Sequence, residues 1–207
     1  MKKIYQLYRF LLRKHGRPKD FWRKWCKRKK TKEDKEEIAL GAILTQRTNW
    51  KRVELVFENL KRAKILSIKK IYQAGKKDLK LLEKLIRPSG FYRQKAKRIY
   101  RFCQFIVENY RNLEKFFSQD LKTCREELLD IPGIGPETAD SILLFAGGKP
   151  IFVIDEYTRC FVKREKISNQ FSYNYLQDLF QKNLPRDAKI YQDFHALIIL
   201  EGQSIKL

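Results

Sequence analysis

One stretch of the chain, residues 128–155, holds two features that could do chemistry: a turn rich in glycine and proline, and a lone carboxylate. The turn, residues 131–136, reads Ile-Pro-Gly-Ile-Gly-Pro and joins two apolar segments. Its glycines permit backbone geometry that other residues avoid, and Pro136 suits the first position of a helix. Such a turn exposes unpaired backbone N–H groups at a helix start, where the helix dipole also favours an anion. We therefore interpret the turn as a grip for a phosphate.

The carboxylate is Asp155, which comes after the second apolar segment and a break that reads Gly147-Gly148-Lys149-Pro150. It stands where another helix would begin, with Thr158 at the third helical position, so its side chain can accept backbone N–H bonds. Those bonds and the helix dipole favour the ionised form. A carboxylate held in this way can stabilise developing positive charge and orient a water molecule. The stretch therefore predicts a phosphate grip and a catalytic acid group at a fixed distance from each other.

The chain as a whole is strongly basic. Its 207 residues include 46 Lys and Arg against 24 Asp and Glu, a formal net charge of +22. Because self-repulsion opposes compaction, the excess indicates a polyanionic partner, with nucleic acid ahead of an anionic membrane surface. The chain has no run of 18 or more apolar residues, the length that could span a bilayer. Its first residues also lack the apolar core of a secretory signal. We expect a cytoplasmic protein associated with the nucleoid.

Helical periodicity dominates, and no stretch alternates as a strand would. The first predicted helix has Tyr5, Tyr8, Leu11 and Leu12 on one face. Next come a helix over 36–45, a helix capped by Thr48 or Asn49, a helix from Asp78 to a stop at 87–90, and a helix over 92–110. The remaining helices are one opened by a capping box of Thr123 and Glu126, one through Cys160 and Phe161, and two over 173–180 and 187–200. Cys26, Cys103, Cys124 and Cys160 are too far apart for a metal clamp, so we interpret them as buried thiols. The pattern predicts an all-α fold of about ten short helices.

A dense basic and aromatic run follows the first predicted helix. It extends from Arg17 to Lys35 and holds Phe21, Trp22 and Trp25. Flat rings beside cations suit nucleobases and phosphates together. A solvated charged face with tryptophans in the core is the alternative, and the sequence leaves both open.

The residues around the turn resemble a known family. Leu129 to Asp140 is similar to the helix-hairpin-helix of the endonuclease III superfamily of DNA glycosylases, and the break followed by Asp155 is similar to the second half of that motif. Ala42 to Thr48 resembles the loop whose Gln fills the gap left by a flipped base, and Phe194 to Gly202 resembles the last helix of endonuclease III. The resemblance implies a two-lobed all-α fold with the hairpin at the cleft. A six-helix barrel lobe would span 35–139, and 1–34 plus 140–207 would form the lobe that carries the catalytic Asp.

Two departures from the superfamily narrow the expected activity. Bifunctional members carry a Lys as Schiff-base nucleophile where this chain has Glu137, and a carboxylate cannot form an imine. Members with an iron–sulfur cluster place four Cys after the last helix, where this chain has none, so no cluster is expected. A monovalent cation at the hairpin stays open. Together with Arg87 to Arg98, these features look most like the cluster-free 3-methyladenine DNA glycosylases.

The resemblance implies a monofunctional DNA N-glycosylase that flips and excises alkylated purines by Asp-assisted hydrolysis. The implied site comprises a catalytic carboxylate, DNA-binding residues and base-pocket aromatics: Asp155; Gly133, Ile134, Gly135, Gln46 and Lys149; Phe21, Trp22 and Trp50. The implied partner is double-stranded DNA with a damaged base, bound by a monomer. Two rivals remain, a bifunctional glycosylase/lyase acting on oxidised bases and a non-catalytic helix-hairpin-helix DNA-binding protein.

Overall fold

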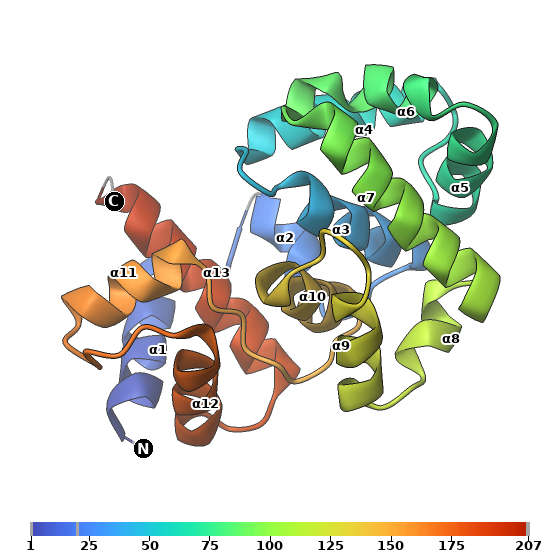
Figure 1. The fold of residues 1–207 in the computed structure, drawn as a ribbon. Coiled ribbons are helices and arrows are strands. Elements are labelled where there is room, and N and C mark those ends of the chain that lie inside the picture. The colour runs from blue at the N-terminus through green and yellow to red at the C-terminus, as the bar shows by residue number, and fades with distance from the viewer. Residues whose placement is uncertain (1, 20, 206–207) are drawn as a thin grey trace. The chain divides into compact units, whose positions relative to one another are not determined.

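The structure is a computed structural model that describes residues 2–19 and 21–205, and every regular element among them is a helix (Figure 1). The predicted all-α fold is therefore confirmed. The helices are α1 (Lys2–His15), α2 (Phe21–Trp25), α3 (Lys32–Leu44), α4 (Trp50–Arg62), α5 (Ile68–Lys77), α6 (Leu79–Ile86), α7 (Tyr92–Phe105), α8 (Leu113–Phe117), α9 (Leu121–Leu129), α10 (Pro136–Ser141), α11 (Glu156–Arg164), α12 (Tyr173–Asn183) and α13 (Ala188–Ser204). A 3₁₀-helix, η1 (Arg87–Ser89), and two π-helical segments, η2 (Ile106–Tyr110) and η3 (Ile142–Ala146), complete the set.

The chain forms two compact units. One is the continuous segment Lys30–Ile142, and the other combines the residues up to Lys29 with those from Leu143 onward. In the continuous unit, α7 packs against α5 and α6, and α10 packs against α9 and α3. The buried face of α7 is apolar through Ala96, Ile99 and Phe102, as its 3.6-residue periodicity requires.

The unit built from both chain ends is organised around α13. Residues 191–198 of this helix are all buried, because α1 and α11 pack against it. Phe194 lies at the centre, with ring contacts to Tyr8, Phe161 and Phe180. α13 is therefore the core helix of this unit, and polar residues such as Asp193 and His195 are buried in it beside the apolar ones.

Side-chain caps fix where most helices begin. The capping residues are Thr31, Asn49, Ser67, Asp78, Asn112, Asp120, Asp155 and Asp187. Of the two candidates for α4, Asn49 is the cap. The capping box expected at Thr123 and Glu126 is wrong, because Asp120 caps α9 three residues earlier and accepts the Thr123 amide. An Asp at this position satisfies two amides of the first turn, so the helix begins at Leu121.

All four cysteines are free thiols. Cys26, Cys103 and Cys124 are buried as expected, whereas Cys160 is only half-buried. Burial raises the pKa of the Cys103 thiol well above its ordinary value. Cys103 is therefore an inert core residue.

Candidate functional site

The hairpin turn between α9 and α10 is anchored by two buried isoleucines and presents two glycines at the surface. Ile131 and Ile134 are 6% and 3% exposed, whereas Gly133 and Gly135 are exposed. Gly133 has a φ of +95°, in the region that favours glycine. The Ile134 amide donates to the carbonyl oxygen of Ile131 at 3.0 Å. Within the described residues no acceptor bonds the amides of Gly133 and Gly135, so these two amides of the turn are open to an anion, whereas that of Ile134 is not.

The side chain of Gln46 is bound to this hairpin. Its Nε2 donates to the carbonyl oxygen of Gly133 at 3.0 Å and to Oγ1 of Thr138 at 2.9 Å. Its Oε1 accepts a bond from Nη1 of Arg98 at 2.5 Å. The structure thus brings Gln46 and Gly133 together, as parts of one hydrogen-bonded network. The predicted role of Gln46 in filling a vacated stack requires these bonds to open.

Arg98, on α7, packs against the hairpin, and sequence reasoning missed this contact. A Cβ atom added at Gly133 would lie 2.5 Å from Nε of Arg98, so the arginine side chain covers that glycine directly. Its neighbour Lys95 is 1% exposed and donates to the carbonyl oxygens of Leu44 and Ser89, both at 2.8 Å. Burial lowers the pKa of Lys95 to about 8, and the nearby Arg98 adds to the effect. Lys95 fastens the end of α3, and therefore the Gln46 loop, to η1.

Asp155 caps α11 through one oxygen of its carboxylate. Oδ1 accepts the Thr158 amide at 2.7 Å and the Thr158 hydroxyl at 2.8 Å, while Oδ2 lies 3.5 Å from Nε2 of His195. Burial by itself raises the pKa of this carboxyl, but His195 and the two Thr158 bonds outweigh it, and the pKa of Asp155 lies below its ordinary value. The side chain keeps 13% exposure, so the carboxyl is not sealed in the core, and its lowered pKa favours the ionised form.

An aromatic cluster surrounds His195 in the same unit. The ring of His195 lies 5.6 Å from that of Phe145, 6.1 Å from that of Trp22 and 6.4 Å from that of Phe152, centroid to centroid. Neither ring nitrogen of His195 has a hydrogen-bond partner among the described residues. His195 was part of the segment that resembles the last helix of endonuclease III, but no sequence pattern indicates that it lies beside Asp155.

The three predicted pocket aromatics belong to different environments. Phe21 is half-buried against Trp22, with centroids 4.7 Å apart, and Trp22 itself is 7% exposed. Trp50 lies in the other unit, at the first position of α4, where its Nε1 donates to Oε1 of Glu54 at 2.8 Å and its ring packs on Phe57. Trp50 is therefore fixed at the surface, and Trp22 is packed in the cluster beside His195.

Two cationic residues of interest are tied down within the unit formed by both chain ends. Lys149 is half-buried in the break before Asp155, and its amide donates to the carbonyl oxygen of Leu143 at 2.9 Å. Arg28, from the basic run, pairs with the buried Asp193 and donates to the carbonyl oxygen of Lys189. Arg28 is exposed like the lysines on either side of it, but its guanidinium is engaged in the ion pair with Asp193.

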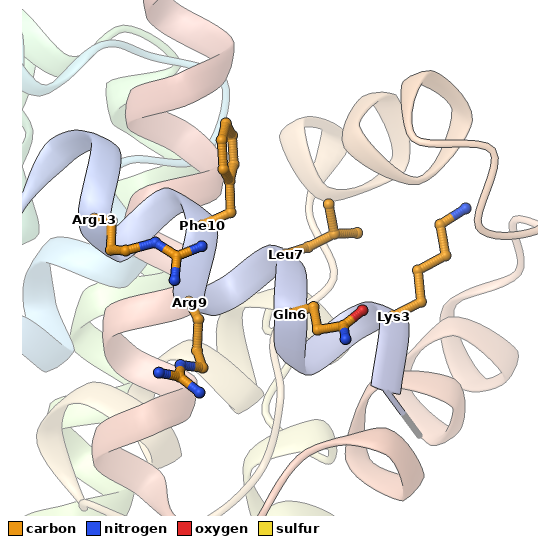
Figure 2. A pocket seen from close by; sticks show the side chains of 6 residues that line it. All are labelled: Lys3, Gln6, Leu7, Arg9, Phe10 and Arg13. Carbon is orange, nitrogen blue, oxygen red and sulfur yellow. The ribbon is translucent and has the colours of Figure 1, made fainter.

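A surface hollow of about 500 Å³ lies along α1, and none of the predicted site residues lines it (Figure 2). Its lining consists of Lys3, Gln6, Leu7, Arg9, Phe10 and Arg13.

No group of three or more His, Cys, Asp and Glu that could hold a metal ion occurs within residues 2–19 and 21–205. No helix in that part of the chain is long and apolar enough to cross a membrane.

Comparisons with known proteins agree with this geometry. The family model described as HhH-GPD superfamily base excision DNA repair protein matches residues 40–186. A Methanocaldococcus jannaschii protein named as a putative DNA repair glycosylase is 43% identical over 199 residues, which cover 95% of this chain and 85% of that protein. Endonuclease III of Thermotoga maritima is 28% identical over 160 residues, 74% of this chain and 67% of the relative.

Solved structures show the same fold. The crystal structure of the 3-methyladenine DNA glycosylase of H. pylori bound to 1,N6-ethenoadenine matches with a TM-score of 0.75 and 31% identity, over 100% of this chain and 96% of that one. A non-covalent endonuclease III–DNA complex matches with a TM-score of 0.74 at 19% identity, over 98% and 87% of the two chains. At that identity the second match supports the fold alone.

Proposed function

We propose that this chain, a DNA repair glycosylase that belongs to the HhH-GPD superfamily of base excision DNA repair proteins, is monofunctional and excises alkylated purines of the 3-methyladenine kind. The reaction is hydrolysis of the N-glycosidic bond, with Asp155 as the catalytic carboxylate. The observation that carries the proposal is the state of this carboxylate. It is held ionised by its surroundings, while Oδ2 makes only the long contact to His195 among the described residues.

The chemistry follows from a carboxylate with one open oxygen. A base inside a duplex has to leave the stack before an enzyme can act on it. As the glycosidic bond breaks, positive charge develops on the sugar, and Oδ2 of Asp155 stabilises that charge. The same oxygen orients the attacking water. The amides of Gly133 and Gly135, with Arg98 beside them, hold a phosphate and position the strand without reading its sequence.

The available amines favour a monofunctional enzyme. Glu137 stands at the position where the resemblance places the Schiff-base Lys, and it is exposed in the first turn of α10. Lys95 has a pKa of about 8, which would suit a nucleophilic amine, but its amino group is buried and donates to two carbonyl oxygens. Neither residue supports strand cleavage through an imine.

The aromatic residues favour a cationic base. A purine methylated on the ring carries positive charge, so contact with an indole face gains a cation–π contribution in addition to stacking. Phe21 and Trp22 lie in the unit that carries Asp155, whereas Trp50 belongs to the other unit. A cationic base is already a good leaving group and needs no general acid. The H. pylori structure, at 31% identity, supports the same lesion class.

The proposed partner is double-stranded DNA with a single damaged base, bound by a monomer in the cytoplasm at the nucleoid. The formal charge of +22 supports a polyanionic partner.

The test is base release from duplexes that each carry one defined lesion. We expect release of 3-methyladenine or a related alkylated purine by the wild-type protein and none by Asp155→Asn, which keeps a good cap and should fold. Asp120→Asn is a matched control, because Asp120 caps α9 through an equivalent Thr at the third helical position. Full activity in Asp120→Asn together with loss in Asp155→Asn assigns the chemistry to Asp155.

The rivals predict other results. Efficient trapping of the protein on abasic DNA by borohydride would show an imine and establish the bifunctional enzyme. DNA binding without release of any base, in the wild type and Asp155→Asn alike, would establish a non-catalytic binding protein.

A further inference from the structure

His195 is a buried imidazole whose environment in the core is unfavourable. Its side chain is 5% exposed and lies among the rings of Trp22, Phe145 and Phe152, and neither ring nitrogen has a hydrogen bond to any described residue. A buried polar group without a partner lowers the stability of the folded state, and such groups are rare. An apolar residue of similar size would avoid this cost. Folding alone therefore does not explain an imidazole at this position.

Asp155 supplies an explanation. Nε2 of His195 lies 3.5 Å from Oδ2 of Asp155, slightly beyond the usual length of a hydrogen bond. The other oxygen, Oδ1, accepts both bonds from Thr158. The two oxygens of the carboxylate thus have separate tasks: Oδ1 is fastened to α11, and Oδ2 faces the imidazole.

Asp120 offers an internal comparison, because it caps α9 and is also followed by a Thr at the third helical position. There Oδ1 accepts the Thr123 amide at 3.0 Å, and Oδ2 accepts the Thr123 hydroxyl at 2.6 Å, so both oxygens are occupied. At Asp155 both threonine bonds fall on one oxygen. Of the two caps, the one beside His195 is the one that leaves an oxygen open.

We propose that His195 is the positioning residue of Asp155: the imidazole, with its proton on Nε2, holds Oδ2 in the orientation in which it faces the sugar. The inference rests on the proposed function. Catalytic hydrogen bonds are often long in the free enzyme and shorten when the substrate binds, which fits the 3.5 Å separation. Because both ring nitrogens are covered, the imidazole acts through Asp155 and does not itself touch the DNA.

The test compares His195→Leu with His195→Gln, which keeps an N–H donor at about the reach of Nε2. Ile198→Ala is the control, since it removes a side chain of 1% exposure from the same helix. The measurements are the single-turnover rate constant of base release at saturating protein and the Kd for the lesion duplex. We expect the rate constant of His195→Leu to fall about 10²-fold. Its Kd should stay unchanged, and His195→Gln should recover most of the rate.

A purely structural role of His195 would give another pattern. The rate constant would then fall equally in His195→Leu and Ile198→Ala, or Gln would restore nothing, and either result overturns the proposal. A rate constant of His195→Leu within about threefold of the wild type also overturns it.

A readout without catalysis separates this inference from the proposed function. The carboxyl carbon of Asp155 is titrated by ¹³C NMR in the free protein. In His195→Leu the pKa of Asp155 should rise, because the carboxyl stays buried and loses the neighbour that lowers it, and in Ile198→Ala it should not move. An unmoved pKa in His195→Leu overturns the inference. If the wild type releases no base from any lesion, the proposed function fails, while this titration still decides whether His195 acts on Asp155.

Discussion

Replacing Gly133 by alanine tests the hairpin most directly, because two independent costs meet at this position. The backbone has a φ of +95°, which an L side chain rarely adopts. The new Cβ would also lie 2.5, 2.7 and 2.8 Å from Nε, Cγ and Cδ of Arg98. These are atoms along the middle of the arginine side chain, so a rotation of its tip alone would not relieve the clash.

The size of the effect follows from these two costs. A left-handed conformation costs a non-glycine residue about 1–2 kcal/mol. Displacing Arg98 breaks its bond to Oε1 of Gln46, which contributes about 1 kcal/mol at a half-buried position. We expect Gly133→Ala to lower the free energy of unfolding by about 2–3 kcal/mol, with Tm falling about 2–4 °C for each kcal/mol in a chain of this size. DNA binding should weaken as well, because the exposed amide moves.

The assay is urea unfolding of the wild type and its variants together with their DNA affinity. Gly135→Ala is the matched control, because a Cβ there meets no atom within 4 Å and its φ is −93°. In an Arg98→Ala background the clash disappears and the backbone cost remains, so Gly133→Ala should cost less there than in the wild type. Equal losses from Gly133→Ala and Gly135→Ala would refute the reasoning on backbone strain. An unchanged cost in the Arg98→Ala background would refute the contact between Arg98 and the hairpin.

Three further predictions concern charge. The free energy of unfolding of the wild type relative to Lys95→Met should rise as the pH increases from about 8 towards 10.5. In that range Lys95 keeps its proton in the unfolded chain and has released it in the folded state. Urea titrations across the range measure the difference. The stability of the wild type relative to Asp155→Asn should decrease as the pH falls through 3.8 and below, since the pKa of Asp155 is lowered in the folded state and the stabilisation by its carboxylate disappears on protonation. Acid unfolding of the two proteins measures this difference. A stability difference that grows with acidity would contradict the prediction. Replacing the exposed Lys27 and Lys29 by Gln should flatten the slope of log K for DNA binding against log salt concentration by about 0.9 for each phosphate that these lysines no longer neutralise. Arg28→Gln should mainly lower stability, because it breaks the ion pair with Asp193. An unchanged slope in the double Lys variant would contradict the first part.

Local sequence signals predicted much of the helical architecture. Asp78 and Asn49 begin helices because a short polar side chain satisfies the first amides, and Pro88 with Gly90 stops α6 near the expected residue. The error at Thr123 has the same origin, since Asp120 offers a stronger cap a few residues earlier. Helix α5, a short helix capped by Ser67, was not predicted.

The site was less predictable than the helices, because its contacts join residues far apart in the chain. The bond between Gln46 and Arg98 joins residues 52 positions apart. Arg98 is one of several basic residues on α7, and its sequence context does not indicate that it bonds Gln46. His195 likewise reaches Asp155 across a long stretch of sequence and resembles an ordinary core position of α13. Turn chemistry and caps are local, so the hairpin glycines and the Asp155 cap were visible, and the side chains that complete them were not.

The division of the chain into a continuous unit and a unit made from its two ends has a consequence for synthesis. Residues 30–142 can fold as soon as they have left the ribosome, so Gln46, Arg98 and the hairpin come together early. The first 29 residues have to wait for the segment from Leu143 onward, which takes several seconds to translate. The phosphate-binding turn of the nascent protein is therefore complete before the carboxylate of Asp155 is in place. Helices α1 and α2 stay exposed to proteases and chaperones until α13 emerges.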